Sequence, residues 1–387
     1  MRRIYLDNSA TTRMSDEVTS AMQPYSGEKF GNASSLYLRG RESAEAIEKV
    51  REQVAGAIGA DTKEIIFTSG GTESDNIALL GAAHAYREHG DHIITSSIEH
   101  PAVMETLEHL RLEGYNVTHV PVDKEGILNV DALNEAVTPN TILISIMHVN
   151  NEIGTIQPLE EVGKIAKEND IVFHSDAIQS FGKIDVNVDR LGVDLLTLSG
   201  HKIHGPKGAG ALFVRKGTKL KAIMYGGGQE RGLRSGTENV PAIVGMGQAS
   251  EIAARDMRKN AAHMTRLRDK LLDGIMKEEY VKLNGSPTKR SPNNVNVSFH
   301  FIEGESLVLM LDAQGVETST GSACSSKDLQ PSHVLRALGM RPEQAHGSLR
   351  LTNSQYNTEE EIDHVLDVLP GITQKLMAMS PLYKPLH

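Results

Sequence analysis

Apolar and polar residues follow two different periods along the first half of the chain. From Glu42 to Ile58 the apolar residues recur at steps of three and four, which predicts a helix with one buried face. Helical patterns also cover 74–89 and 131–137. Short apolar runs typical of buried strands lie at 64–68, 92–95, 117–122, 142–149, 171–174 and 195–198. Strands that alternate with helices predict a mostly parallel sheet with helices on both faces.

The pattern changes after residue 207. A further strand is expected at 208–214, and the tight turn before it favours an antiparallel direction. Residues 226–239 form a glycine-rich loop, and loops of that length are usually functional or belong to an interface. A long helical region, broken near its middle, is expected over 240–277.

The last third of the chain has the pattern of a smaller domain. Strands are expected at 294–299 and 348–351, and helices at 305–312 and 359–377. Strands and helices that do not alternate strictly are typical of an α+β arrangement.

These patterns together predict an α/β protein of two domains, for which 387 residues are sufficient. We expect a large, mostly parallel sheet domain over 15–258 and a smaller α+β domain over 259–387. Residues 1–14 are expected to form an N-terminal segment that joins the small domain. The small domain would carry Cys324.

The charge balance limits the classes of partner. The chain has 40 basic and 50 acidic residues, a formal net charge of −10, which argues against direct binding to nucleic acid or to an anionic membrane. It contains no apolar run long enough to span a membrane, and its first residues lack the apolar stretch of a signal peptide. We therefore expect a soluble, cytoplasmic protein.

Cys324 is the one cysteine of the sequence, so an intrachain disulfide and a multi-cysteine metal site are excluded. It lies within Ser319–Lys327, a small, polar, glycine-containing segment of the kind that forms exposed loops. This setting favours a reactive thiol over a buried structural cysteine. The sixteen histidines form no HExxH or similar motif, so no metal is assigned.

A candidate anion site follows the strand at 64–68. The turn Ser69–Glu73 contains two glycines and opens a helix, where free N–H groups and the helix dipole attract negative charge. The lysine and the four-residue spacer of a Walker loop are absent, so a phosphate monoester near Thr72 is the simpler interpretation.

Polar residues follow several of the other predicted strands. Ligands of open α/β sheets bind outside the carboxyl ends of the strands, so these residues are expected to share one site. They are His100, Asn151, Asp176, Gln179, His201 and Lys202.

Three of the polar residues indicate a pyridine-aldehyde cofactor, although each also has an interpretation without a functional role. Lys202 can form a Schiff base with an aldehyde, or belong to a solvated basic loop. Asp176 can hold a ring nitrogen protonated, or be a surface acid or helix cap. His100 can stack on a planar ring and handle protons near neutral pH as a catalytic group, or be solvated.

Arg350 lies in a short apolar strand, where a buried guanidinium needs an anion. A substrate carboxylate, bound through two parallel hydrogen bonds, meets that need. An intramolecular ion pair is the alternative.

Across nearly its whole length the chain resembles the NifS/IscS type of cysteine desulfurase, within the fold-type I (aminotransferase-like) enzymes that use pyridoxal 5'-phosphate. The motifs that carry the resemblance are Tyr5–Thr12, Phe30–Ser35, Phe67–Ser74, Glu99–Pro101, His148–Gly154, His174–Gln179, Ser199–Lys202, Arg234–Thr237 and Gly321–Cys324. The resemblance implies conversion of L-cysteine to L-alanine, with the sulfur carried as a persulfide on Cys324. It also implies a homodimer that delivers sulfur to an iron–sulfur scaffold or another acceptor protein.

The resemblance further implies a role for each matching residue. Lys202 would form the Schiff base, Asp176 would pair with the pyridinium nitrogen and His100 would stack on the ring. Gln179 would bond the ring hydroxyl, and Asn151 would lie near that hydroxyl and the substrate. The phosphate would be held by Gly71, Thr72, Ser199, Gly200, His201 and, from a second subunit, Thr237. Arg350 would bind the substrate carboxylate, and Cys324 would accept sulfur and could transiently ligate a cluster.

The sequence departs from the family pattern at three places. Ala33 replaces a common proline, and Tyr37 replaces a histidine. In Thr352–Tyr356 the arginine expected by the family is Gln355, a change that bears on the local support of Arg350 and on the rate. Alternatives to the desulfurase are a selenocysteine lyase, a pyridoxal-phosphate aminotransferase, or a sulfur-relay scaffold that acts mainly by binding partners.

Overall fold

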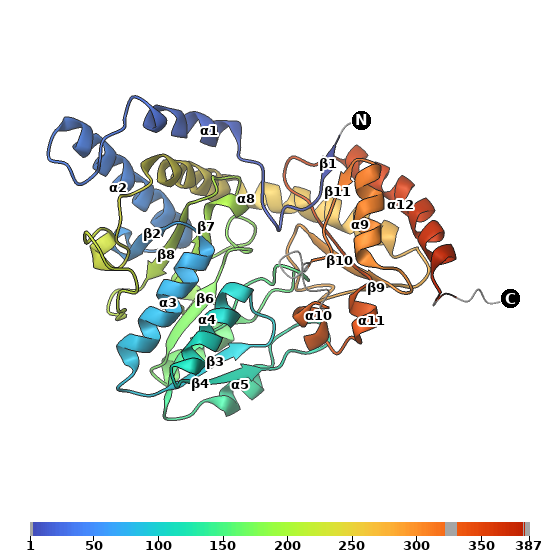
Figure 1. The fold of residues 1–387 in the computed structure, drawn as a ribbon, viewed down its shortest axis with the longest axis horizontal. Coiled ribbons are helices and arrows are strands. Elements are labelled where there is room, and N and C mark those ends of the chain that lie inside the picture. The colour runs from blue at the N-terminus through green and yellow to red at the C-terminus, as the bar shows by residue number, and fades with distance from the viewer. Residues whose placement is uncertain (1–2, 322–330, 382, 384–387) are drawn as a thin grey trace.

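A seven-stranded sheet forms the centre of the larger part of the molecule (Figure 1). The structure is a computed structural model and describes residues 3–321, 331–381 and 383. The strand order is β2-β8-β7-β6-β5-β3-β4. Strand β8 runs in the opposite direction to all the other strands of this sheet. The strands are β2 (Ile65–Thr68), β3 (His92–Ser96), β4 (Asn116–Val120), β5 (Thr141–Ser145), β6 (Val172–Asp176), β7 (Leu195–Ser199) and β8 (Gly210–Val214). The predicted mostly parallel sheet is therefore confirmed, as is the direction of β8.

Helices cover both faces of this sheet because successive residues of each strand point to opposite sides. On one face Ile66 packs with helices α3 (Gly71–Tyr86) and α4 (Pro101–Leu112). On the other face Ile65 and Phe67 belong to a second apolar cluster. Its helices are α2 (Leu38–Ile58), α6 (Leu159–Glu168) and the first half of α8 (Val240–Ile275).

A second, smaller sheet lies beyond α8 and has its own apolar core. Its antiparallel order is β12-β10-β9, formed by Ser348–Thr352, Asn294–Phe299 and Val281–Leu283. Helices α9 (Gly304–Ala313) and α12 (Glu359–Met379) pack on it, with the last turns of α8. Near this core the first strand, β1 (Ile4–Tyr5), pairs in parallel with β11 (Val316–Glu317).

The remaining helices are short and lie in connections. They are α1 (Asp16–Met22), α5 (Val130–Ala136), α7 (Val188–Leu191), α10 (His333–Ala337) and α11 (Pro342–Ala345). Single 3₁₀ turns lie at Gln23–Ser26, Thr62–Glu64, Gly200–Lys202 and Glu230–Gly232.

The predicted break in the long helical region is wrong. Helix α8 runs without interruption through 36 residues. Its first half packs on the large sheet and its last turns pack on the small one, whereas no residue from 254 to 263 is buried. The apolar period fades in the middle of the helix because α8 crosses there between two cores. The expected domain boundary at 258 therefore falls inside α8. The domain division itself stays a prediction.

The strand predicted at 142–149 is too long. Strand β5 ends at Ser145, although Ile146 to Val149 are buried. The N–H of Met147 donates to the carboxylate of Glu99, at 3.1 and 3.0 Å from its two oxygens, so a side chain replaces the strand partner. Helix α3 begins at Gly71, three residues before the predicted start, so the glycine turn belongs to its first turn.

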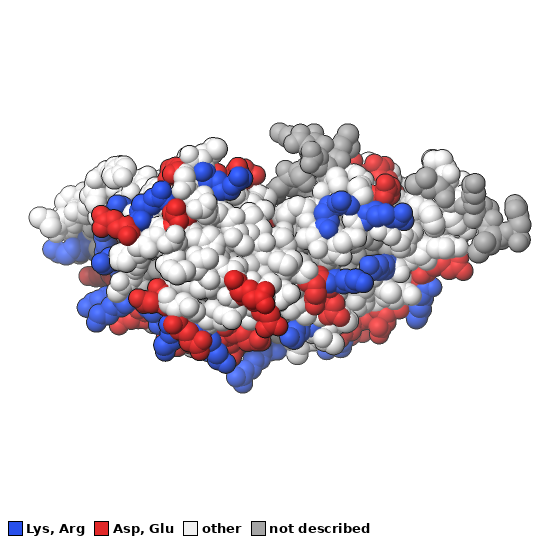
Figure 2. Space-filling view, turned by 90° about the horizontal axis from the view of Figure 1, so that it is seen from below, with Lys and Arg blue, Asp and Glu red and all other residues white. Residues whose placement is uncertain are grey.

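The surface carries both signs of charge. On the face shown in Figure 2, Lys and Arg are interspersed with Asp and Glu. Among the helices of the described residues, none has both the length and the apolar character that a membrane span requires.

Candidate active site

The carboxyl ends of the parallel strands open into one cavity of about 490 Å³. His100 follows β3, Asn151 follows β5, Asp176 ends β6, and Lys202 follows β7. Of the residues predicted to form the site, the cavity is lined by Gly71, Thr72, His100, Asn151, Asp176, Gln179, Ser199, His201, Lys202 and Arg350. Segments separated by up to 279 positions, from Gly71 to Arg350, thus meet in one place, as the rule for open α/β sheets predicts.

Lys202 is held by the N-terminal segment. Its Nζ donates to the backbone carbonyls of Ser9 at 2.5 Å and Ala10 at 2.6 Å. The adjacent His201 contacts the hydroxyl of Thr11 at 3.1 Å. These carbonyls orient the amine toward the cavity, and the sequence analysis did not single out Ser9 or Ala10. Backbone acceptors leave no signature in side-chain pattern, so no signal was available for them.

The start of α3 forms an anion cradle. Gly71 is the first residue of this 16-residue helix, whose N-terminal N–H groups and dipole favour a negative ligand. A Cβ at Gly71 would lie 2.1 Å from Cδ1 of Ile178, so a side chain there would clash. The buried hydroxyl of Ser199 has no hydrogen-bond partner among the described residues. An unsatisfied hydroxyl beside a helix N-terminus fits a phosphate group.

Asp176 lies at the floor of the cavity and is 5% exposed. Its Oδ1 accepts the N–H of Ile178 at 2.9 Å. Burial, followed by the nearby carboxylate of Asp75, raises the pKa of Asp176 to about 7, while His174 and Lys202 act in the opposite direction. A carboxyl with this pKa is a suitable partner for a protonated ring nitrogen.

His100 is a neutral imidazole at the start of α4. Its Nδ1 accepts the N–H of Ala102 at 3.1 Å, and burial lowers its pKa to about 4, helped by Lys202 and His333. Gln179 donates through Nε2 to the carbonyl of Ser9 at 2.9 Å. A planar neutral ring and an amide therefore line the same cavity as Lys202 and Asp176.

Arg350 has an internal counterion and still lines the cavity. Its Nη2 lies 2.7 Å from Oδ1 of Asp7, and its Nη1 donates to the carbonyls of Asn151 at 3.0 Å and Gly321 at 3.4 Å. The buried Nε has no hydrogen-bond partner among the described residues. The intramolecular ion pair, which was the alternative interpretation of Arg350, is thus present. The Nε–H remains available for a ligand.

In the unusual segment Thr352–Tyr356, Thr352 pairs with Asp7, the counterion of Arg350. Gln355 lines a different cavity, on the far side of Lys202. Arg350 is positioned instead by Asp7 and by two backbone carbonyls. Gln355 therefore gives no direct support to Arg350, and the effect of this departure on the rate stays a prediction.

Several buried groups near the site were missed by sequence reasoning. Asp75 in α3 is fully buried, 3.5 Å from Nε2 of His174, and burial raises its pKa to about 7. Burial raises the pKa of Glu99 to about 8. The first half of α3 is mostly polar in sequence, so the pattern gave no signal that Asp75 is buried. His333 also lines the cavity, with its Nε2 2.9 Å from the carbonyl of Glu99.

Two predicted site residues, Gly200 and Thr237, do not line the cavity. Gly200 is buried and its N–H donates to the carbonyl of Ala209 at 3.0 Å. Thr237 is exposed on the loop before α8. Cys324 lies outside the described residues, but Gly321 and His333, on either side of the undescribed 322–330, both line the cavity. The roles of these residues stay predictions. The described residues contain no group of three or more metal-ligating side chains.

Comparisons with known proteins agree with this geometry. The family model for aminotransferase class-V matches residues 4–365. A cysteine desulfurase IscS of Methanosarcina thermophila is 54% identical over 98% of this chain and 94% of its own length. A solved NifS-like protein is 41% identical, with a TM-score of 0.91 over 97% of this chain and all of its own. A structure of SspA in complex with cysteine is 37% identical, with a TM-score of 0.81 over 92% of this chain and all of its own.

The cavity fits the cofactor of these proteins, pyridoxal 5'-phosphate. It offers an amine at Lys202, a carboxyl at Asp176 and an unsatisfied hydroxyl at Ser199 beside a helix N-terminus. The identities, the coverage and the family model all exceed what a shared fold alone would give. The chain belongs to the aminotransferase class-V family of pyridoxal-phosphate enzymes, on the branch of the NifS/IscS-type cysteine desulfurases.

Proposed function

We propose that this protein is a cysteine desulfurase, which converts L-cysteine to L-alanine and passes the sulfur to acceptors for iron–sulfur cluster assembly or other sulfur-containing products. The observation that carries the proposal is the sharing of one cavity by Lys202, Asp176 and Arg350. An amine, a ring-nitrogen partner and a carboxylate-binding cation are the groups that pyridoxal-phosphate chemistry on an amino acid needs.

Most of the predicted residues that line the cavity have a part in holding the cofactor. Asp176 pairs with the ring nitrogen and His100 stacks on the ring. Gln179 and Asn151 lie toward the ring hydroxyl. Gly71, Thr72, Ser199 and His201 hold the phosphate, with Gly200 and, from a second subunit, Thr237. When bound, the cofactor supplies an electron sink that weakens the bonds at the α-carbon and then at the β-carbon of the substrate.

One cation orients the substrate, and one amine transfers its α-proton. Arg350 binds the α-carboxylate through its Nε–H, which has no partner among the described residues. The Nζ of Lys202 would hold the aldehyde of the cofactor and, once released, would take the proton that leaves the α-carbon of the substrate. The carbonyls of Ser9 and Ala10 keep this amine at the cavity wall.

The sulfur step belongs to Cys324. Its thiolate attacks the substrate sulfur, so that a sulfur–sulfur bond forms while the carbon–sulfur bond breaks. The substrate carbon is reduced to the methyl group of alanine, and the transferred sulfur becomes the outer atom of a persulfide. The thiol proton of Cys324 and the thiol proton of the substrate account for the proton on alanine and the proton on the persulfide.

Absorbance spectroscopy tests this proposal directly. The wild-type protein with cofactor should change its visible spectrum on addition of cysteine and form alanine and sulfane sulfur in equal amounts. Cys324→Ser should keep the spectral change but form no persulfide, and the neighbouring Ser326→Ala is its matched control. Lys202→Ala should lose the visible band that borohydride reduces, and a band that survives would refute the lysine assignment.

The same assay separates the alternatives. A selenocysteine lyase would release selenide from selenocysteine and little sulfur from cysteine. An aminotransferase would form a keto acid instead of alanine. A relay scaffold would turn over only when an acceptor protein is present.

We further propose a cytoplasmic homodimer that delivers sulfur to a scaffold or another acceptor protein. Support comes from large apolar side chains exposed near the loop of Thr237, including Phe30 (69%), Leu36 (89%) and Tyr225 (86%). Ala33 and Glu230 line one groove, so the segment of Phe30 and Leu36 is a neighbour of the loop that holds Tyr225 and Thr237. Apolar side chains gathered in this way are typical of a protein interface. Gel filtration with light scattering measures the mass, and a monomer would contradict the proposal.

A further inference from the structure

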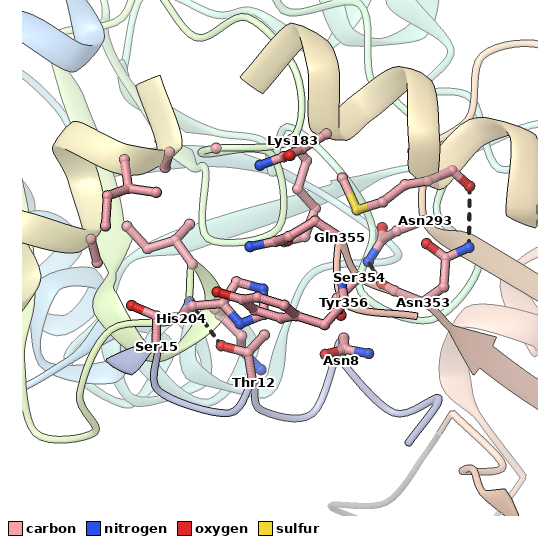
Figure 3. A pocket seen from close by; sticks show the side chains of 18 residues that line it. Asn8, Thr12, Ser15, Lys183, His204, Asn293, Asn353, Ser354, Gln355 and Tyr356 are labelled. Carbon is pink, nitrogen blue, oxygen red and sulfur yellow. Dashed lines mark hydrogen bonds between the residues drawn. The ribbon is translucent and has the colours of Figure 1, made fainter. Parts of the chain in front are cut away.

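A second cavity lies on the other side of Lys202 (Figure 3). Lys202 belongs to the lining of this cavity and to that of the active site. The free space is about 30 Å³, which is room for one or two water-sized groups. Its walls come from the N-terminal segment, from α8, and from the segment of Gln355 and Tyr356. We call it the rear pocket.

The rear pocket has an unbalanced charge. Lys183 and Lys202 line it, and no Asp or Glu is among its lining residues within the described part of the chain. Lys183 is 6% exposed and forms no ion pair with any described residue. Its Nζ donates to one neutral partner, the carbonyl of Gln179 at 3.2 Å. Burial, followed by the charge of Lys202, lowers the pKa of Lys183 to about 7.

A buried ammonium without a counterion is unfavourable, so either the proton or an anion must compensate. The remaining wall is largely polar, but the side chains of Asn8, Thr12 and Asn293 already donate to backbone carbonyls, which leaves Gln355 as the donor beside Lys183. Figure 3 shows the side chains of Lys183 and Gln355 entering the pocket, with His204 and Asn8 around it. Donors and cations without a carboxylate form the surroundings that anions prefer.

We propose that the rear pocket binds one small inorganic anion of the size of chloride, held by the ammonium of Lys183 and the side-chain amide of Gln355. The small free space suits a monatomic anion better than a larger one such as sulfate. Hydrosulfide has the same charge and a similar size, so it belongs to the same ligand class. A bound anion offsets the repulsion between Lys183 and Lys202 and keeps Lys183 protonated.

Bromide locates such an anion without reference to activity. Crystals of the full-length protein with its cofactor, grown in bromide, should show an anomalous peak within hydrogen-bonding distance of Nζ of Lys183. Ordered water at that position, without anomalous signal, would overturn the proposal and indicate a neutral lysine.

Solution measurements connect the anion to Lys183. Sulfate by itself stabilises folded proteins more than bromide does, so the effect of the site is the difference between variants. At equal ionic strength the midpoint of thermal unfolding in saturating bromide, relative to sulfate, should be about 3 °C higher in wild type than without the site. Lys183→Met should lose this increase, whereas Lys164→Met, on an exposed face of α6, should retain it. An equal bromide effect in wild type and Lys183→Met would contradict the proposal.

Gln355→Glu gives a second test that does not depend on removing the lysine. The new carboxylate would pair with Lys183 inside the pocket, so the variant should bind no bromide while remaining folded. Bromide binding as in wild type would argue against the site. Competition of chloride and of hydrosulfide against bromide then shows which of the two binds more tightly.

Discussion

The Oδ1 atom of Asp7 lies 2.7 Å from Nη2 of Arg350 and ties the N-terminal segment to strand β12. The Arg350 side chain is 3% exposed and that of Asp7 is 18% exposed. Asp7 therefore neutralises a buried cation while leaving its Nε without a partner among the described residues. The pair supports both the closure of the N-terminus onto the small sheet and the proposed binding of a substrate carboxylate.

Replacing Arg350 by Met should weaken substrate binding. Loss of a charged hydrogen-bonded contact corresponds to about 3 kcal/mol, so KM for cysteine should rise on the order of 100-fold. The cofactor spectrum should change little, because Arg350 contacts only the backbone carbonyl of Asn151 among the groups assigned to the ring. Steady-state kinetics measure the effect, and an unchanged KM would contradict the assignment.

The double variant Asp7→Asn with Arg350→Met is the matched control. Arg350→Met leaves the carboxylate of Asp7 partly buried and unpaired, which should destabilise the fold. The added Asp7→Asn should recover part of that stability in thermal unfolding without restoring KM. Recovery of KM would mean that Arg350 acts only as a structural partner of Asp7.

Cofactor affinity should depend on the ionisation of Asp176. Its folded-state pKa is about 7, so the carboxylate is present above that pH and is lost as pH falls through it. The dissociation constant of pyridoxal 5'-phosphate from the apoprotein should therefore rise between pH 8 and 6, by up to about tenfold for each unit below the pKa.

Asp75→Asn separates this effect from the titration of the cofactor itself. Asp75 raises the pKa of Asp176, so removing its charge should move the midpoint of the pH dependence to lower pH. Asp176→Asn should remove the component due to the protein. An identical midpoint in wild type and Asp75→Asn, from fluorescence titrations, would exclude the proposed coupling.

Buried His148 should make the fold sensitive to mild acid. Burial lowers its pKa to about 4 from 6.5, with Arg190 adding to the effect. The neutral ring therefore contributes its full stability above pH 6.5 and loses it as pH falls toward 4, a change of up to about 3 kcal/mol. Denaturant unfolding of His148→Gln should show a correspondingly smaller loss over this window than wild type. The exposed His119→Gln should follow wild type.

Hybrid dimers test whether Thr237 acts across subunits. Thr237→Asp should repel the cofactor phosphate, and Lys202→Ala should be inactive. A purified hybrid of the two subunits contains one site with an intact lysine and an intact partner Thr237, so it should recover about half of the wild-type activity. An inactive hybrid would place Thr237 in the site of its own subunit.

Local sequence pattern was sufficient for much of the architecture. The alternation of apolar runs and helical periods predicts the mostly parallel sheet, and polar residues after the strands identify His100, Asp176 and Lys202 as neighbours. These predictions succeed because strand burial and helix faces depend on residues a few positions apart. The same reasoning fails for α8, where exposure between two cores resembles a break.

Tertiary structure alone decided how the site is supported. The carbonyls of Ser9 and Ala10 reach Lys202 across more than 190 positions, and Asp7 reaches Arg350 across 343. Backbone carbonyls have no side-chain signature, and an ion pair between distant segments has no periodicity. The sequence was therefore enough to identify the site residues. Only the packing of distant segments shows which groups contact them, and only it shows the charge of the rear pocket beside Lys183.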